Sequence, residues 1–105
     1  MLRIYSVILD LVSDVRPLIE QIERRDPDLA GQCRRAMSSL ALNVAEGSQS
    51  QGRNRKARYH NACGSAREGL GGLELAVRWG YIAVIPAEVK ARFGHVIATL
   101  VKVMR

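Results

Sequence analysis

Residues 4–22, IYSVILDLVSDVRPLIEQI, contain the pattern that decides the fold. Their main apolar residues are separated alternately by four and three positions, and they are Ile4, Ile8, Leu11, Val15, Leu18 and Ile22. This spacing places one continuous apolar stripe along a single side of an α-helix, as in helical bundles and coiled coils. The period-two alternation that is typical of a half-buried β-strand does not occur in it. The stretch therefore predicts a helix that packs against other helices.

Three later stretches repeat this helical spacing, the first of them less strictly. Their apolar positions are Leu29, Cys33, Ala36 or Met37, Leu40 and Val44; then Tyr59, Cys63, Ala66, Leu70, Leu73 and Val77; and finally Val89, Phe93, Val96, Leu100 and Val103. Breaks separate the stretches at the turn around Pro27, at the polar linker 46–52 and at residues 80–86, where Pro86 suits the start of a helix. We therefore expect helices at about residues 2–25, 28–47, 53–79 and 86–104.

Short connections between consecutive helices make those helices antiparallel neighbours. The length of 105 residues is that of one domain. We therefore predict that residues 1–105 form a single domain of the all-α class. Its expected architecture is an up-down-up-down antiparallel four-helix bundle.

Composition and cysteine content narrow the class of protein. Hydrophobic residues make up 48% of the chain and charged residues 25%, which is typical of a globular protein and not of a disordered one. Two cysteines are too few for a disulfide framework, which favours a reducing compartment. Asp10 and Asp14 interrupt the apolar N-terminal stretch, and no run reaches the ~18 apolar residues of a membrane span. We expect a cytoplasmic protein with no membrane partner.

The first and last predicted helices carry more apolar residues than one core-facing stripe needs. The third also holds four glycines, each of which costs a helix up to about 1 kcal/mol relative to alanine, so another backbone is expected to approach it closely. Surplus apolar area usually marks an interface, although a wide stripe packed inside the bundle also accounts for it. We expect self-association, and the candidate interface residues are Tyr5, Val12, Ile19, Gly71, Gly72, Ile97, Val101 and Met104.

Positive charge is concentrated in the middle of the chain. The chain has 16 Lys and Arg against 10 Asp and Glu, a net charge of +6, and Glu46 is the only acid in residues 29–67. A basic cluster stands at the predicted start of the third helix, where positive charge opposes the helix dipole. Such a cluster suits contact with the phosphates of RNA or DNA; a protein partner and a solvated helix end are the alternatives. The candidate nucleic-acid-binding residues are Arg53, Arg55, Lys56 and Arg58.

The second and third predicted helices are expected to pair about a turn near residues 50 and 51, so that residue numbers summing to about 101 lie side by side. Glu46 then lies level with Arg55. Glu68 comes near Arg34 or Arg35. We interpret these polar residues as a network that holds the two helices in register, because half-buried charges need partners; direct contact with a ligand is the alternative. The expected network is Arg34, Arg35, Asn43, Glu46, Ser65 and Glu68.

The sequence shows no constellation typical of catalysis or metal binding. His60 and Cys63 share a helical face, but no second pair completes a tetrahedral metal site, and the Glu-x-x-His motif of di-iron bundles does not occur. Cys63 lies on the core stripe and is expected to be a buried thiol. Ser38 and Ser39 have no nearby histidine that would act as a base. We expect a non-enzymatic protein with no cofactor and no metal.

Residues 34–47, RRAMSSLALNVAEG, carry a family resemblance. They are similar to the pattern R-R-A followed by S-I-x-x-N-I-A-E-G in the bacterial 23S rRNA-intervening-sequence proteins. Further matches follow in the family's order over nearly the whole chain: Tyr5 with residues 9–12 (LDLV), residues 62–68 (ACGSARE) and residues 79–82 (WGYI).

The resemblance implies an up-down four-helix bundle that assembles into a ring-shaped homo-oligomer, a pentamer in the form associated with the family, with no enzymatic activity. A more distant resemblance is to the accessory protein of diversity-generating retroelements, a basic pentamer thought to bind nucleic acid. Together with the basic cluster, this favours electrostatic binding of RNA or DNA. An oligomeric protein–protein adaptor or scaffold without a nucleic-acid ligand is the alternative. The chain departs from the family pattern at Gly71, at Gly72 and in the linker 49–53.

Overall fold

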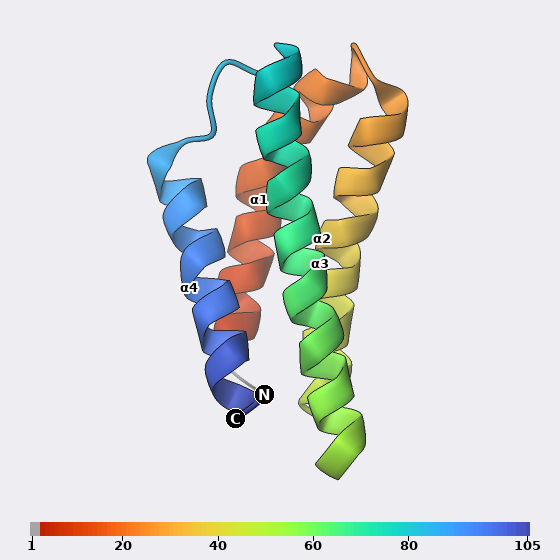
Figure 1. Ribbon diagram of the computed structural model, residues 1–105, viewed down its shortest axis with the longest axis vertical. Helices are drawn as coiled ribbons and strands as arrows, with labels where there is room; N and C mark the ends of the chain where they lie inside the picture. The colour runs from red at the N-terminus through yellow and green to blue at the C-terminus, as the bar shows by residue number, and fades with distance from the viewer. Residues whose placement is uncertain (1–2) are drawn as a thin grey trace.

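The computed structural model describes residues 3–105 as four α-helices joined by short connections (Figure 1). No strand occurs in this part of the chain, so the predicted all-α class with four helices is confirmed. The predicted start of the first helix at residue 2 lies outside the described residues. The helices are α1 (Ile4–Glu23), α2 (Pro27–Gly47), α3 (Gly52–Trp79) and α4 (Ala87–Val103).

Local sequence accounts for where the helices begin and end. The Asp26 side chain accepts a hydrogen bond of 3.0 Å from the Leu29 backbone N–H, and Pro27 occupies the first turn of α2, where its missing N–H costs nothing. Gly80 ends α3 in the left-handed conformation, with φ of 81°, which glycine adopts without steric cost. Pro86 precedes α4. These residues fix the short turns that bring consecutive helices side by side.

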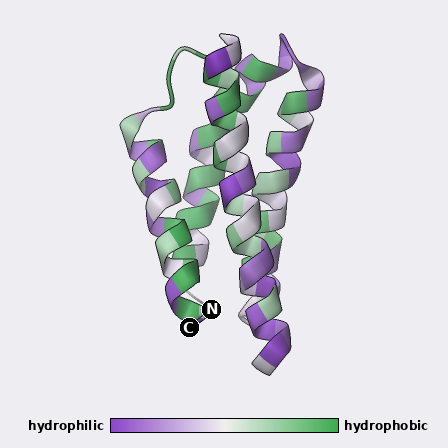
Figure 2. Ribbon diagram, in the orientation of Figure 1, coloured by the Kyte–Doolittle hydropathy of each residue, from purple (hydrophilic) through white to green (hydrophobic). Residues whose placement is uncertain are grey.

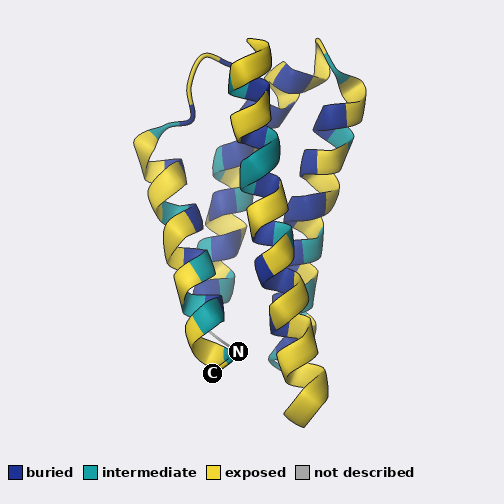
Figure 3. Ribbon diagram, viewed as in Figure 1, coloured by how far each residue is buried: buried dark blue, intermediate teal, exposed yellow. Residues whose placement is uncertain are grey.

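The helices run along the long axis of the molecule, and consecutive helices point in opposite directions (Figure 1). Each helix packs against its two neighbours in the order α1, α2, α3, α4, and α4 returns to α1. Apolar residues face inward along all four helices, and the faces turned away from the core are largely polar (Figures 2 and 3). The core extends into the connection before α4 through the buried Ile82 and Ile85.

The most extensive contact is between α2 and α3, and glycines make it close. A Cβ atom at Gly72 would lie 2.6 Å from Cys33 Sγ, and one at Gly47 would lie 2.5 Å from Cε1 of the Tyr59 ring. Both distances are shorter than van der Waals contact allows. Glycine at these positions therefore lets side chains of the opposite helix pack directly on the backbone.

The register of α2 on α3 differs from the predicted one. Glu46 pairs with Arg58 and not with Arg55, and Ser39 lies against Ser65, three residues beyond the expected position 62. A slide of three residues is nearly one helical turn, so the same two faces meet in either register. The observed register places Cys33 over Gly72 and Tyr59 over Gly47.

Two candidate interface residues belong to the packing of the protomer itself. Gly72 contacts Cys33 of α2, and Ile19 is only 5% exposed. The protomer's own side chains therefore cover nearly all of Ile19 and the side of Gly72 on which a Cβ would stand. A Cβ at Gly71 or Gly64 would meet no atom of another element within 4 Å, so these glycines face outward.

In the part of the chain that the structure covers, no helix is long and apolar enough to cross a membrane.

Two substitutions in α3 compare a glycine that packs against α2 with a glycine that faces outward. Gly72→Ala is expected to lower the free energy of unfolding by about 1–2 kcal/mol, because the clash with Cys33 outweighs the gain in helix propensity. Gly64→Ala is expected to raise it by about 0.5–1 kcal/mol, because nothing obstructs the new methyl group. Urea denaturation measures both variants, and stabilisation by Gly72→Ala would contradict the close packing.

Candidate nucleic-acid interface

The basic cluster, Arg53, Arg55, Lys56 and Arg58, occupies the first two turns of α3, and all four residues are exposed. The start of α3 projects beyond the start of α1 and the end of α4 (Figure 1). Most residues of this part of α3 are hydrophilic (Figure 2). The cluster is therefore open to a large partner.

The four cations of the cluster differ in their partners. Arg58 Nη2 lies 2.9 Å from Glu46 Oε2, so the C-terminal end of α2 neutralises this charge. Within residues 3–105, Arg53, Arg55 and Lys56 form no ion pair. Three positive charges remain available to an anion.

These three cations surround a pocket between the start of α3 and the end of α4. Its other lining residues are Gly52, Tyr59 and Val103. The guanidinium carbon of Arg55 lies 5.6 Å from the centroid of the Tyr59 ring, a cation–π contact. The Tyr59 ring itself is buried between this pocket and Gly47. The pocket thus combines exposed positive charge with a rigid aromatic wall.

The expected polar network is present only in part. The Ser65 hydroxyl donates to Ser39 Oγ at 2.8 Å and so connects α3 to α2. The Asn43 amide donates to the Ser39 carbonyl oxygen at 2.8 Å and to Ser39 Oγ at 3.1 Å, within α2. Glu68 is exposed and forms no ion pair among the residues described, and the Arg35 guanidinium lies over Gly31 of its own helix. The expected contact of Glu68 with Arg34 or Arg35 is therefore wrong.

Arg34 connects α2 to α1 instead of to α3. Its guanidinium donates to both carboxylate oxygens of Glu23, at 2.7 Å and 3.2 Å. The hydrogen bonds and charge of Arg34 hold the pKa of the Glu23 carboxyl below its ordinary value. Both side chains are half-exposed, so solvent screens the pair and its contribution to stability is small.

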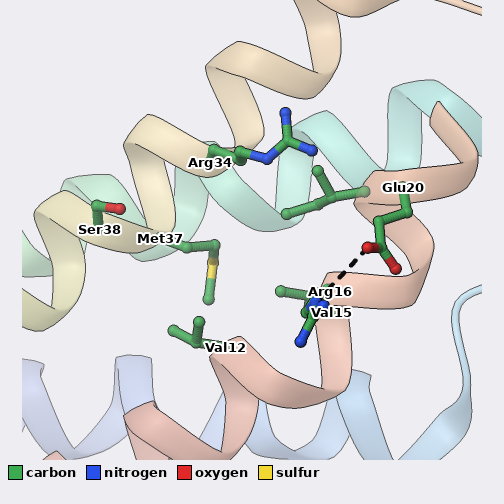
Figure 4. A pocket seen from close by; sticks show the side chains of 8 residues that line it. Val12, Val15, Arg16, Glu20, Arg34, Met37 and Ser38 are labelled. Carbon is green, nitrogen blue, oxygen red and sulfur yellow. Dashed lines mark ion pairs between the residues drawn. The ribbon is translucent and has the colours of Figure 1, made fainter. Parts of the chain in front are cut away.

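A second pocket lies between α1 and α2 (Figure 4). Val12, Val15, Ile19 and Met37 form its apolar part. Charged and polar side chains stand around them, including Arg16, which pairs with Glu20 within α1. Two candidate interface residues, Val12 and Ile19, therefore line this pocket, which has both apolar and charged lining residues.

Comparison with known proteins identifies the family. Residues 1–101 match the family model described as 23S rRNA-intervening sequence protein. The chain belongs to this family. The similarity extends over nearly the whole bundle, as the motifs from residue 5 to residue 82 predict.

A crystal structure of a protein of unknown function from the S23 ribosomal protein family of Bacteroides thetaiotaomicron has a similar fold. The TM-score is 0.81 and the sequence identity 19%, and the match covers 97% of this chain and 98% of that chain. At this identity the likeness shows the fold alone. No curated protein matches the chain. Neither description names an enzymatic activity.

The described residues were also compared with the groups that metal binding and thiol chemistry require. Among residues 3–105, no group of three or more His, Cys, Asp or Glu side chains is placed to hold a metal ion. Cys33 and Cys63 are buried free thiols. Burial raises the pKa of the Cys33 thiol, and the nearby Glu68 carboxylate adds to this, so the reactive thiolate is disfavoured. The basic pocket at the start of α3 is the strongest candidate site.

Two contacts of the structure cannot be predicted from the apolar pattern of the sequence. One is the packing of Tyr59 on Gly47, which accounts for the glycine of the N-V-A-E-G motif. The other is the ion pair between Asp14 of α1 and Arg92 of α4, which joins the first helix to the last. The signal for the first is a glycine next to the linker with an aromatic residue in the facing helix. The second joins residues that are distant in the chain, and no local signal reveals it.

The Arg34–Glu23 pair gives a pH-dependent prediction. Because folding lowers the pKa of Glu23, the pair stabilises the protein above the ordinary glutamate pKa, and this is lost as the pH falls through the lowered value. Arg34→Gln is expected to return the pKa of Glu23 to its ordinary range, as measured by NMR titration of the side-chain carboxyl. Arg35→Gln is the control and should leave that pKa unchanged, and an unshifted pKa in both variants would contradict the pairing.

Proposed function

We propose that the protein is a non-enzymatic, homo-oligomeric binder of RNA or DNA, and that the basic cluster at the start of α3 contacts the phosphates. The observation that carries the proposal is a set of three cations that form no ion pair among residues 3–105, on a helix end that projects from the bundle. Contacts of this kind read phosphates and nucleic-acid shape and not base sequence.

Surplus apolar surface on two sides of the protomer supports self-association. On α1, Tyr5 and Val12 are half-buried, and Val12 lines the hollow beside α2. On α4, Ile97 and Val101 are half-buried, and Val101 lies about 180° around the helix from Arg92, which faces α1. One apolar face is therefore on the α1–α2 side and the other on the α3–α4 side.

Two different faces on opposite sides suit a head-to-tail arrangement of copies. When the α1–α2 face of one copy packs on the α3–α4 face of the next, every interface is the same, and the assembly closes into a ring if the rotation allows. We propose a ring of five copies, which is the number that the family resemblance implies. Such a ring repeats the basic cluster once per copy at one end.

An oligomeric adaptor for another protein is the second candidate. The exposed side chains of Leu75, Trp79 and Val84, at the end of the bundle opposite the basic cluster, favour it. A protein partner held by apolar contacts would bind with little dependence on salt, whereas binding to phosphates weakens steeply as salt rises.

Both free cysteines fit a reducing compartment, and we propose the cytoplasm as the location.

Salt-dependent binding tests the nucleic-acid proposal. Labelled RNA and DNA fragments, single-stranded and duplex, are titrated with the full-length protein at several salt concentrations. The wild-type protein is expected to bind at low salt and to lose affinity steeply as salt rises. The variant Arg53→Glu, Arg55→Glu, Lys56→Glu is expected to bind more than about tenfold more weakly and with a shallower salt dependence.

A charge-matched control is Arg24→Glu, Arg35→Glu, Arg67→Glu, which changes three exposed cations outside the cluster. It alters the net charge equally and is expected to retain most of the binding. Light scattering confirms that all three proteins have the same size. Equal loss in the two variants would show that only net charge matters, and absence of wild-type binding at low salt would exclude the proposal.

Self-association is tested by placing a charge on each apolar face in turn. Val12→Glu and Val101→Glu are each expected to reduce the mass measured by light scattering to that of a protomer while the helical circular dichroism persists, because a buried unpaired carboxylate is costly. Leu42→Glu, at a position 61% exposed on α2, serves as the control. A wild-type protein that is monomeric would exclude the ring.

A further inference from the structure

A shallow polar groove runs along the outer side of α2 and α3. Two pockets form it, with volumes of about 420 and 330 Å³, and they adjoin at Asn61, which lines both. Most of the side chains that line them carry amide or hydroxyl groups, among them Ser39 and Asn43 in the first pocket and Ser50 and Asn54 in the second. Because Asn54 lies in the same helical turns as the basic cluster, the groove begins beside the cluster.

The same side of α3 stays open from this groove to the far end of the helix. Gly64 and Glu68 line the groove. Further along α3 come Gly71, Leu75 and Trp79, at steps of three or four residues, which keep all five positions on one side of a helix. A Cβ at Gly64 or Gly71 would meet no atom of another element within 4 Å. An open surface therefore leads from the basic cluster to Trp79.

Trp79 is a large apolar side chain that α3 leaves in solvent at this far end. It is 63% exposed, and its ring stacks on the ring of Tyr81, with centroids 6.4 Å apart and an interplanar angle of 19°. The guanidinium carbon of Arg25 lies 5.6 Å from the centroid of the Tyr81 ring, and Arg25 forms no ion pair in the part of the chain that the structure describes. An exposed ring that is held in place near a free cation is the arrangement on which proteins stack the bases of single strands.

We propose that the open side of α3 binds a single-stranded segment of RNA or DNA, with one unpaired base stacked on Trp79. The phosphates of the strand contact the basic cluster at one end and Arg25 at the other. From Asn54 to Trp79 the helix rises about 38 Å, which a stacked strand of about 11 nucleotides spans. The inference rests on the proposed nucleic-acid binding and adds to it an unpaired base as a second point of contact.

The distribution of polar and apolar groups favours a nucleic-acid strand over a protein on this surface. A protein interface has an apolar centre and a polar rim, whereas here the middle is polar and the exposed aromatic ring stands at one end. Amides such as Asn61 and the carboxylate of Glu68 suit the hydrogen-bonding edges of bases. Paired bases inside a duplex are stacked on one another, so only an unpaired base offers its flat face to Trp79 along the length of a strand.

Trp79 is the only tryptophan of the chain, so its fluorescence reports directly on the proposed stacking. The full-length protein is titrated at low salt with an RNA strand of about 20 nucleotides, longer than the proposed path, with the duplex of the same sequence, and with an abasic strand of the same length. The single strand is expected to quench the emission of Trp79 and to bind about tenfold more tightly than the abasic strand, because stacking of one base contributes roughly that factor. The duplex and the abasic strand are expected to bind the cations and to leave the emission nearly unchanged.

The outcomes separate this inference from the proposed function. A single strand that saturates the protein without quenching Trp79 would overturn the stacking and leave the nucleic-acid proposal standing. Absence of binding by every strand at low salt would overturn both. An emission that changes when the protein alone is diluted would show that a second copy of the chain covers Trp79, and would overturn the inference.

Substitution of Trp79 tests the stacking by a second readout, the fluorescence anisotropy of a labelled strand. Trp79→Ala is expected to bind the single strand about tenfold more weakly and the abasic strand as the wild type does. Trp79→Phe keeps an aromatic ring and should retain most of the affinity. Val84→Ala, at the same end of the bundle and also 63% exposed, is the matched control and should bind as the wild type does. Equal weakening of the single strand and the abasic strand by Trp79→Ala would contradict the stacking.

Obstruction of the groove tests the path of the strand along α3. Gly64→Leu places a large side chain in the groove, about 22 Å along the helix from Trp79. The variant is expected to stay folded, because a Cβ at this position meets no atom of another element within 4 Å, and to lose both affinity for the single strand and quenching of Trp79. Ala91→Leu, at an exposed position on α4, is the control. Equal loss in both variants, with folding checked by circular dichroism and size by light scattering, or loss in neither, would contradict the proposed path.

Discussion

The close packing of α2 on α3 through glycines positions the other features of the molecule. At Gly47 and Gly72, side chains of the facing helix occupy the space in which a Cβ would stand. Such contacts tolerate little displacement, because a protein interior is packed as densely as an organic crystal. They determine how far α3 extends past the end of α2, and therefore where the basic cluster lies. α1 and α4 complete the core and are joined by the ion pair of Asp14 with Arg92.

The apolar pattern is sufficient to predict the all-α fold class and the number of helices. Four apolar stripes of helical spacing are separated by stretches that contain proline, glycine or several polar residues. It is insufficient for the register of α2 on α3. A slide of three residues nearly completes a helical turn, so the apolar faces meet equally well before and after it. The two registers differ in which side chain of one helix lies over each glycine of the other. That match, as between Gly47 and Tyr59, becomes visible only when the two helices are placed together.

Some features of the candidate site can likewise be predicted from the sequence, and others depend on how the helices pack. The basic cluster follows from counting charges, since four cations without an acid stand at a predicted helix start. The pairing of those cations depends on the register, which brings Arg58 level with Glu46 and leaves the other three free among residues 3–105. Burial of Tyr59 is predictable from its place on the core stripe. Among the residues described, the Tyr59 hydroxyl has no hydrogen-bond partner, and this depends on which side chains the neighbouring helices place at that end of the bundle.

The positive charge at the start of α3 acts against the stability of the protomer. Cations in the first turn of a helix oppose the helix dipole, and neighbouring cations repel one another. In the proposed ring each copy adds the same unfavourable charges at the same end, so the repulsion increases with the number of copies. A polyanion relieves that repulsion at several copies at once, and its affinity rises with the number of clusters that it contacts. The apolar faces and the basic cluster would then serve one purpose, since assembly converts a locally unfavourable helix end into a continuous surface for a nucleic-acid strand.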